Sequence, residues 1–467
     1  MKNEILVQWD AILARKAQHP AVKRSSGEVA FTFAQLDETA RRISAELAPI
    51  IGRGDVVALQ APNCPEWPAL LLAIWRAGGC PLLLDHTLGE IARDAAEQGC
   101  GALARLGWGQ DGRAQMTPLA HPHAEMGDAT PELIKLTSGT TGIPRAILFT
   151  SAQIAADCDQ ICETMGIGEA DWNYGVVAFS HSYGFSNLIT PLLCRGVPLV
   201  AAEDALPRAV LSGMAASGAT VLPAVPAVFQ ALGAVEGAMP SLRLCISAGA
   251  PLRPDTARAF RERFGRKVHV FYGASECGGI AYDGSEDEEL ALGFVGRPMH
   301  GVRIETLEDG GIAVHSQAVG LGYFPAAMGE EALSSGIFRP VDLIEETPDG
   351  WRIVGRRSDI INVGGKKVNP AEVESLLLEH PAVREAVVFG VQCDARSQAI
   401  CACVVARGEI GEGELRAYCA ARLATWQVPR SIIQLDALPV NARGKISRAE
   451  LAKRFESLSG STGERGG

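Results

Sequence analysis

Residues 137–145 form a short stretch that is rich in hydroxyl groups and glycine and follows an apolar run. Its hydroxyl residues are Thr137, Ser138, Thr140 and Thr141, its glycines are Gly139 and Gly142, and it ends at Arg145. Hydroxyl groups donate hydrogen bonds, and glycines let neighbouring backbone N–H groups turn toward one anion. The arginine adds a fixed positive charge. The stretch indicates a loop that holds the β- and γ-phosphates of a nucleotide; its alternative interpretation is a polar hairpin turn.

The spacing of these residues argues against a different kind of phosphate loop. The Walker loop needs the pattern G-x-x-x-x-G-K-[ST], in which a lysine directly follows the second glycine. No such string occurs among the 467 residues. The sequence therefore disfavours a kinase-like phosphotransferase or a P-loop ATPase.

The string TSGTTGIPR at residues 137–145 resembles the phosphate loop of the adenylate-forming superfamily. That family includes acyl-CoA synthetases, the adenylation domains of peptide synthetases, and firefly luciferase. It usually carries lysine and glycine after the proline, where this chain has Arg145 and Ala146. Arginine keeps the positive charge, but its planar guanidinium presents donors differently from a lysine ammonium. The resemblance implies that ATP is a substrate and that Arg145 supports its phosphates.

Two further strings resemble motifs of the same family. FYGASE at residues 271–276 is similar to the family's Y-G-x-T-E, with serine in place of threonine. By this resemblance Tyr272 stacks on adenine and Glu276 binds Mg²⁺, a hard cation that prefers oxygen ligands. SAGAPL at residues 247–252 is similar to the segment that lines the adenine and acyl sites. The implied nucleotide-binding residues are Ser247, Gly249, Ala250, Tyr272, Gly273 and Ser275. Taken alone, Glu276 would be a surface carboxylate and residues 247–252 a turn.

The second half of the chain continues the resemblance. Asp342 lies where the family keeps an aspartate for the ribose hydroxyls, and a carboxylate can accept two such hydrogen bonds; Val341 precedes it instead of the usual glycine. Arg356, in a Gly-Arg pair, corresponds to an arginine that contacts the nucleotide. Ser358 falls at the family's hinge position, and Asp359 is the alternative hinge residue. An ordinary linker between domains is the other interpretation of this segment.

Two motifs near the C-terminus complete the set. VGGKKV at residues 363–368 resembles the loop that lines a thiol tunnel, where Gly364 and Gly365 leave room for a pantetheine arm and Lys367 is a further contact. A basic turn is the alternative. LPVNARGK at residues 438–445 resembles the family's L-P-x-T-x-x-G-K, with Asn441 in place of threonine. The resemblance implies that Lys445 is the catalytic lysine.

The segment FSHSYG at residues 179–184 aligns with the wall of the family's acyl pocket. Its H-x-Y pattern is similar to activators of aryl acids, and a related string occurs in fatty-acyl ligases. Amino-acid-activating members carry aspartate where this chain has Ser182. The resemblance therefore favours an aromatic or short, mostly apolar acid and gives His181 a catalytic role; without it, His181 would be a core histidine. The implied pocket residues are His181, Tyr183, Ser186, Ala248, Ala274 and Gly278.

The elements that must hold these motifs alternate between strands and helices. Apolar spacing predicts helices at residues 33–47 and 69–75 and strands at residues 56–59, 81–84, 133–136, 242–246 and 268–271. Such alternation indicates parallel sheets that are covered on both faces. Residues 107–131 are polar and irregular, which predicts a surface loop.

The last third of the chain has a different pattern. Residues 311–353 are rich in glycine, aromatic and β-branched residues, which predicts antiparallel β structure. Asn369-Pro370 predicts a helix start. The predicted fold class is α/β. A large N-terminal domain, residues 1–357, has several subdomains of mostly parallel sheets flanked by helices, plus a β-rich subdomain. Residues 358–467 form a small, mobile α+β domain.

Composition limits the partners. The chain has 43 basic and 54 acidic residues and a net charge of −11, so it has no general attraction for nucleic acid or anionic lipid. Its 12 cysteines form no pair of C-x-x-C units, which argues against structural zinc. The first residues lack an apolar signal core, and Arg76 interrupts the most apolar stretch. We therefore expect reduced thiols, no membrane span and a cytoplasmic location.

The predicted function is activation of a small carboxylic acid by ATP and Mg²⁺, followed by transfer of the acyl group to coenzyme A. One alternative acceptor is the phosphopantetheine arm of an acyl carrier protein, which presents the same thiol. An alternative of another class is a non-catalytic relative that binds nucleotide without turnover; the altered residues Arg145, Ala146 and Val341 are its support. The expected oligomeric state is a monomer or a homodimer.

Overall fold

The computed structural model describes residues 2–124, 126, 130–137, 145–287, 290–308, 310–325, 332–394, 397–439, 448, 450–453 and 455. Contacts divide the chain into two compact units. The large unit comprises Met1–Leu307, Ile312–Pro340 and Glu346–Arg352, and the small unit comprises Glu308–Gly311, Val341–Glu345 and Ile353–Gly467. Each unit is described by itself.

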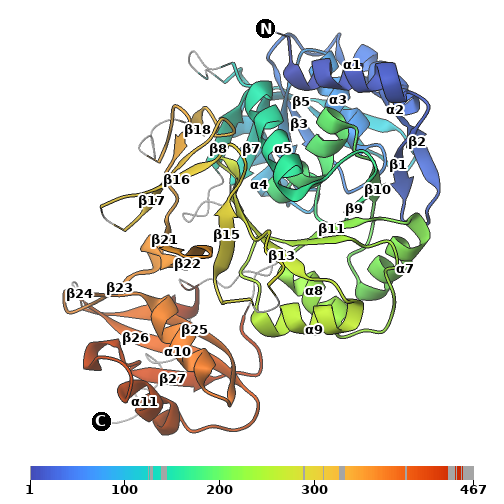
Figure 1. The fold of residues 1–467 in the computed structure, drawn as a ribbon. Coiled ribbons are helices and arrows are strands. Elements are labelled where there is room, and N and C mark those ends of the chain that lie inside the picture. The colour runs from blue at the N-terminus through green and yellow to red at the C-terminus, as the bar shows by residue number, and fades with distance from the viewer. Residues whose placement is uncertain are drawn as a thin grey trace. The chain divides into compact units, whose positions relative to one another are not determined.

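The largest sheet has a parallel centre and antiparallel edges (Figure 1). In spatial order its eleven described strands are β2 (Val29–Thr32), β1 (Pro20–Arg24), β10 (Leu199–Ala201), β9 (Asn173–Gly175), β11 (Val221–Ala224), β12 (Leu244–Ser247), β13 (Val268–Ala274), β14 (Gly278–Tyr282), β15 (Phe294–Pro298), β22 (Gly350–Arg356) and β21 (Asp342–Thr347). The pairings from β1 to β13 are parallel. The strands β14, β15 and β22 then continue the sheet in antiparallel fashion. The division between the two units falls within the β21–β22 hairpin.

A second sheet belongs to the large unit. Its seven described strands are, in order, β18 (Gly322–Phe324), β8 (Arg145–Phe149), β7 (Leu133–Thr137), β4 (Cys80–Leu84), β3 (Val56–Gln60), β5 (Ala102–Trp108) and β6 (Ala114–Pro118). The four strands from β7 to β5 are parallel and apolar, as expected for a sheet that is covered on both faces. A small antiparallel sheet is formed by β16 (Arg303–Thr306), β17 (Ile312–His315), β20 (Ile337–Phe338) and β19 (Leu333–Ser334).

Helices cover these sheets (Figure 1). Those of the large unit are α1 (Glu4–Lys16), α2 (Phe33–Leu47), α3 (Trp67–Arg76), α4 (Glu90–Gly99), α5 (Ser151–Met165), α6 (Ser182–Gly184), α7 (Pro207–Ser217), α8 (Pro226–Gly233) and α9 (Pro254–Phe264), with π-helical turns η1 (Phe185–Ile189) and η2 (Pro191–Arg195). Thr150 and Gln153 form a capping box that starts α5. The first nine residues of α3 are all buried, because this helix lies between α2 and the seven-stranded sheet.

The small unit has its own core. Strands β25 (Val383–Asp394), β26 (Ser397–Ala406) and β27 (Ser431–Gln434) form one sheet, and β23 (Ile361–Val363) pairs with β24 (Lys366–Val368). Helices α10 (Pro370–Glu379) and α11 (Glu412–Ala420) pack on the three-stranded sheet (Figure 1). Short 3₁₀ turns occur at η3 (Arg357–Asp359) and η4 (Thr425–Gln427). Leu377, Val388 and Val404 are fully buried in the core between these elements.

The structure confirms most of the predicted elements and corrects one. Helix α2 spans the predicted residues, and the Asn369 side chain caps α10 by accepting a hydrogen bond from the backbone of Ala371. The prediction that residues 107–131 are only a surface loop was wrong. Strand β6 lies within this range and pairs with β5, because alternate β6 residues remain exposed at the sheet edge and carry no apolar signal.

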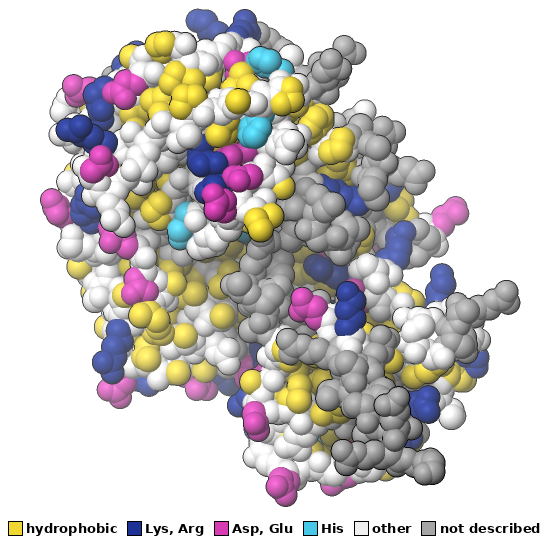
Figure 2. Space-filling view, turned by 180° about the vertical axis from the view of Figure 1, so that it is seen from behind, with side chains coloured by type: hydrophobic (Ala, Val, Ile, Leu, Met, Phe, Trp, Pro, Cys, Tyr) yellow, Lys and Arg dark blue, Asp and Glu magenta, His cyan; other side chains and the backbone are white. Residues whose placement is uncertain are grey.

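Thiols and surface charge complete the description. All twelve cysteines are free and ten are buried. Among the described helices, none combines the length and apolarity needed to cross a membrane. Figure 2 shows basic and acidic side chains interspersed over one face.

Candidate active site

The ends of the predicted phosphate loop lie side by side in the seven-stranded sheet. Thr137 closes β7 and Arg145 opens β8, and the two residues are antiparallel partners. The Thr137 hydroxyl donates to the Arg145 carbonyl oxygen at 3.5 Å. The residues between them that were predicted to bind phosphate lie outside the described part of the chain: Ser138, Gly139, Thr140, Thr141 and Gly142. The sheet thus fixes where the loop leaves and where it returns.

Glu276, Tyr323 and Arg145 meet beside these loop ends. The Tyr323 hydroxyl donates to Glu276 Oε1 at 3.0 Å, and the Arg145 guanidinium carbon lies 5.7 Å from the centroid of the Tyr323 ring. Burial and the Glu276 charge raise the pKa of the Tyr323 hydroxyl, so it remains a proton donor. Sequence reasoning missed Tyr323, which reaches this place because β18 pairs with β8.

The residues expected around the nucleotide lie at adjacent ends of β12 and β13. Ser247 and Ala248 are buried, whereas Gly249 and Ala250 are exposed. Gly249 has φ +85°, a left-handed conformation that favours glycine. Strand β13 and the residue directly after it carry four further candidates, of which Gly273 is exposed and the others are half-buried: Tyr272, Gly273, Ala274 and Ser275. The register against β14 shifts between the first two of them.

A hydrogen bond joins two of the predicted motifs. Ser182, in the segment proposed for the acyl pocket, donates its hydroxyl hydrogen to Ser275 Oγ at 3.0 Å. His181 precedes it as the N-terminal flanking residue of α6 and is exposed. The alternative of a core histidine is therefore wrong, because the chain turns into α6 with the imidazole at the surface.

Tyr183 and Ser186 point into the protein. The Tyr183 hydroxyl donates to the carbonyl oxygen of Ile246 at 2.8 Å, and burial raises its pKa. Ser186 donates to Oδ2 of the buried Asp157 at 2.5 Å. The other oxygen, Oδ1, accepts a hydrogen bond from the backbone N–H of Gly279 at 3.0 Å. Asp157 therefore holds together two segments that contain predicted pocket residues, and no sequence pattern indicated this role.

Gly278 lies against the same carboxylate. Its φ is +68°, and a Cβ atom at this position would overlap the Asp157 side chain. Both features require glycine. Gly278, two residues after the motif YGASE, thus allows the chain to pass close to Asp157 on α5.

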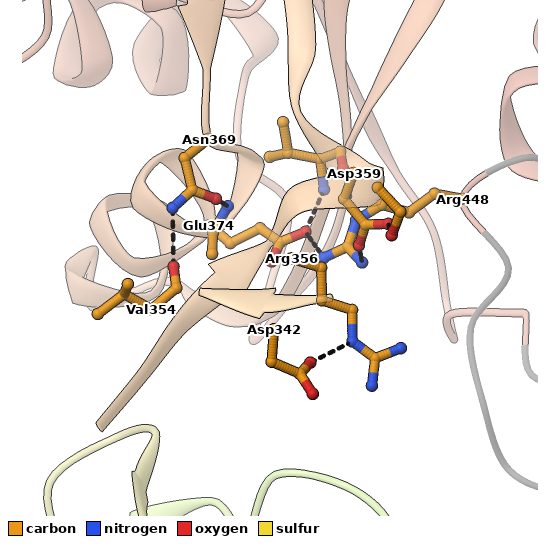
Figure 3. A network of polar contacts seen from close by, with 10 residues as sticks. Asp342, Val354, Arg356, Asp359, Asn369, Glu374 and Arg448 are labelled. Atoms are coloured by element: carbon orange, nitrogen blue, oxygen red, sulfur yellow. Dashed lines mark hydrogen bonds and ion pairs between the residues drawn. The ribbon is translucent and has the colours of Figure 1, made fainter. Parts of the chain in front are cut away.

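The remaining predicted residues belong to the small unit. Figure 3 shows Asp342 and Arg356 pointing toward one another, and Arg356 Nε donates to Asp342 Oδ1 at 2.8 Å. The Asp342 side chain is 13% exposed and that of Arg356 is 57% exposed. The carboxylate and the guanidinium that were predicted to contact the nucleotide therefore lie together.

A second polar network surrounds the predicted hinge. Arg448 donates to Asp359 Oδ2 at 2.6 Å and to both oxygens of Glu374 at 2.8 and 2.9 Å (Figure 3). Ser358 donates its hydroxyl hydrogen to Asp359 Oδ1 at 3.1 Å. Lys445, the predicted catalytic residue, lies outside the described residues. The hinge position stays a prediction, and sequence reasoning missed Arg448, which binds Asp359 there.

The predicted thiol-tunnel loop is the tight turn between β23 and β24. Gly364 and Gly365 both have positive φ, at +57° and +87°. Their N–H groups donate to Ser397 Oγ at 2.9 Å and Asn362 Oδ1 at 3.0 Å. Lys367 is exposed on β24. The turn therefore has a backbone conformation that only glycine adopts readily.

The structure groups the candidates by unit. The large unit brings together Arg145, Glu276, Ser275 and the segment that contains His181. The small unit contains Asp342, Arg356, Gly364, Gly365 and Lys367.

Comparisons with known proteins agree with this arrangement. The profile described as "AMP-binding enzyme" matches residues 9–104 and 97–324, and "AMP-binding enzyme C-terminal domain" matches residues 372–445. The chain is 30% identical to "Probable CoA ligase CCL9" of Humulus lupulus, over 92% of each chain. It is 29% identical to "Feruloyl-CoA synthase" of Amycolatopsis sp, over 97% of this chain and 100% of the relative.

A solved structure shares the fold. The o-succinylbenzoate CoA synthetase of Bacillus subtilis, in complex with its acyl-adenylate intermediate, superposes with a TM-score of 0.80 at 25% identity, over 97% of this chain and 98% of that one. The predicted α/β architecture is thereby confirmed. The chain belongs to the family of AMP-binding enzymes, the adenylate-forming family that its motifs predicted.

Proposed function

We propose that this enzyme uses ATP to activate a carboxylic acid as an acyl-adenylate and then transfers the acyl group to the thiol of coenzyme A. The class of reaction, acid–thiol ligation with release of AMP, follows from the family. The observation that carries the proposal is the meeting of Glu276, Tyr323 and Arg145 at the two ends of the phosphate loop. A carboxylate and a guanidinium at this place suit a divalent cation and the phosphates of ATP.

In the first step an oxygen of the substrate carboxylate attacks the α-phosphorus of ATP. A carboxyl–phosphate bond forms, the bond to the β-phosphate oxygen breaks, and pyrophosphate leaves. The protein aligns the two reactants and neutralises charge. Arg145 and residues 137–142 bind the phosphates, Tyr272 stacks on adenine, and Lys445 binds the carboxylate and α-phosphate oxygens. Glu276 would hold Mg²⁺, which would supply charge neutralisation.

The surroundings of the Glu276 carboxylate suit a ligand of Mg²⁺. This side chain is only partly exposed, and Tyr323 orients one of its oxygens, so that the other has a defined direction. One carboxylate with phosphate oxygens is the usual environment of Mg²⁺ in nucleotide sites. His181 and the segment that follows it line the acid site.

In the second step the thiol sulfur attacks the acyl carbon and its proton passes to solvent. A thioester bond forms, the bond between the acyl carbon and the phosphate oxygen breaks, and AMP leaves with the electrons of that bond. We assign adenylation to residues 1–357 and the catalytic lysine to residues 358–467. The segment at Ser358 and Asp359 is the hinge on which the small domain turns. Gly364, Gly365 and Lys367 then line the path of the pantetheine arm.

The substrate is an aromatic or short apolar acid. Support comes from the H-x-Y pattern at His181 and from the relatives named for feruloyl-CoA and o-succinylbenzoate. A carrier-protein phosphopantetheine is the alternative acceptor. A non-catalytic role is disfavoured by the pairing of Asp342 with Arg356 and by the presence of Glu276 and Lys445. We further propose a cytoplasmic enzyme that is a monomer or homodimer.

ATP–pyrophosphate exchange tests this function. Purified protein is assayed with panels of aryl, short-chain and long-chain acids, beside Lys445→Ala. We expect exchange with one class of acid and a loss of about 10²-fold or more in the variant, with ATP binding retained. Addition of coenzyme A or a carrier protein then identifies the acceptor by thioester formation. Absence of exchange with every acid, in protein that binds ATP, would favour the non-catalytic alternative.

A further inference from the structure

The Asn63 side chain makes three hydrogen bonds to a distant segment of the chain. Asn63 lies in the connection between β3 and α3 and is half-buried. Its Nδ2 donates to the carbonyl oxygens of Gly175 at 3.0 Å and Val177 at 2.9 Å, and its Oδ1 accepts from the backbone N–H of Phe179 at 2.9 Å. These partners fix the orientation of the amide, because its nitrogen faces two acceptors and its oxygen faces a donor.

The segment that Asn63 holds, residues 176–181, connects β9 to α6 and contains no helix or strand. Backbone polar groups in such a connection need partners from outside it. Trp67, at the start of α3, adds an edge-to-face contact with Phe179, with the ring centroids 5.8 Å apart. The connection before α3 and the start of that helix therefore support the segment with both a polar and an apolar contact.

His181 lies between two anchored points of this chain segment. Two residues upstream, the N–H of Phe179 is bound by Asn63. Two residues downstream, the Tyr183 hydroxyl donates to the carbonyl oxygen of Ile246 on β12 at 2.8 Å. The segment begins at the carboxyl end of β9, which belongs with β12 to the parallel part of the eleven-stranded sheet, and ligands bind at such strand ends. The upstream anchor follows β3 and thus comes from the seven-stranded sheet.

We propose that Asn63 is a positioning residue for acid activation, because its amide sets where His181 lies relative to these strand ends. The inference rests on the proposed function, in which His181 and the segment that follows it line the acid site. Removal of the amide leaves the Tyr183 anchor in place, so residues 176–181 lose their defined position while the nucleotide residues keep theirs. A small displacement of a group that aligns the reactants lowers the rate by a large factor. The alternative is that the three hydrogen bonds only stabilise the folded state.

A double-mutant cycle of Asn63→Ala and His181→Ala separates these two roles. The measurement is ATP–pyrophosphate exchange with the acid that the wild type uses best. We expect Asn63→Ala to lower kcat/KM for the acid by at least about 10-fold and to leave the KM for ATP within about twofold. In the His181→Ala background the same substitution should cost less than about threefold, because its effect passes through the imidazole. Equal losses in both backgrounds, or wild-type kinetics in His181→Ala, would overturn the inference.

Asn63→Asp tests the two donors themselves. Aspartate keeps the shape and the acceptor of the side chain, but an oxygen then faces the two carbonyl groups in place of the nitrogen. This variant should lower kcat/KM for the acid at least as much as Asn63→Ala, and wild-type kinetics in it would contradict the positioning role. Asn63→Ser, which keeps a hydroxyl donor, takes the place of Asn63→Ala in the cycle if that variant does not fold.

Gln160→Ala is the matched control for the loss of an amide. Gln160 on α5 is 5% exposed, and its Nε2 donates to Ser316 Oγ at 3.0 Å. Its replacement should lower the free energy of unfolding in urea but leave kcat/KM for the acid within about twofold. A control that loses acid activation as strongly as Asn63→Ala would overturn the inference. Absence of all exchange in the wild type would instead overturn the proposed function.

Discussion

Tyr323 donates a hydrogen bond to Glu276 at 3.0 Å although the two residues are 47 positions apart in the sequence. The pairing of β18 with β8 produces this contact and also places the Tyr323 ring near Arg145. A residue on a neighbouring strand therefore helps to orient this carboxylate. A carboxylate with one oxygen fixed presents the other to a cation with less loss of side-chain entropy.

Removal of the Tyr323 hydroxyl should raise the Mg²⁺ concentration that the enzyme requires for adenylation. Hydrogen bonds to charged groups contribute about 1.5–3 kcal/mol. In Tyr323→Phe we expect the Mg²⁺ concentration for half-maximal exchange to rise by about 10-fold, since each 1.4 kcal/mol is a factor of ten. The measurement is a Mg²⁺ titration of ATP–pyrophosphate exchange at saturating ATP and acid. Tyr418→Phe, in the small unit, is the control, and an identical titration curve for both variants would contradict the role.

The hydrogen bond between Ser182 and Ser275 should couple the acid segment to the nucleotide segment. Both hydroxyls belong to predicted motifs and lie 3.0 Å apart. In a double-mutant cycle of Ser182→Ala and Ser275→Ala, we expect a coupling free energy of about 1 kcal/mol in kcat/KM for the acid. The second substitution should then cost little once the first is present. Strictly additive effects would mean that the two segments act independently.

The sequence predicted the motifs of this site better than the contacts that hold them. Glu276 and Arg145 were found because their strings have fixed neighbours. Tyr323 and Asp157 were not found, because a tyrosine on a three-residue strand and an aspartate within a helix carry no local pattern. Their roles arise from strand pairing and helix packing between distant segments. Strand β6 was missed for the related reason that an edge strand need not be apolar.

Gly278 provides a test of close packing next to the site. In Gly278→Ala the left-handed backbone costs about 1 kcal/mol, and the new methyl group must also displace the Asp157 carboxylate. Gly112→Ala is a matched control, because its φ of +73° is similar but nothing lies within 4 Å of the new Cβ atom. We expect Gly278→Ala to lower both the free energy of unfolding and acid activation, and Gly112→Ala to lower only the former, by about 1 kcal/mol. Equal effects on activity would show that displacement of Asp157 is unimportant.

Arg448 should control the pH dependence of stability in the small unit. Burial raises the pKa of Glu374, while Arg448 and the backbone N–H of Val388 lower it and Asp359 raises it. Because the net folded pKa exceeds the unfolded value, Glu374 contributes most to stability below its unfolded pKa. That contribution is lost as pH rises through the folded pKa. Arg448 limits this loss by pairing with the carboxylate at 2.8 and 2.9 Å.

In Arg448→Ala the folded pKa of Glu374 should rise further, so the free energy of unfolding should fall more steeply between about pH 4.5 and neutrality than in the wild type. We expect a loss of about 2 kcal/mol at neutral pH, below the usual cost of breaking a fully buried ion pair because the Arg448 side chain is 31% exposed. The measurement is urea unfolding across this pH range. The double variant with Glu374→Gln should lose the extra pH dependence, since no carboxylate remains to ionise. Parallel pH profiles for Arg448→Ala and the wild type would mean that water solvates the Glu374 carboxylate in the variant, and that Arg448 acts mainly through Asp359 at the predicted hinge.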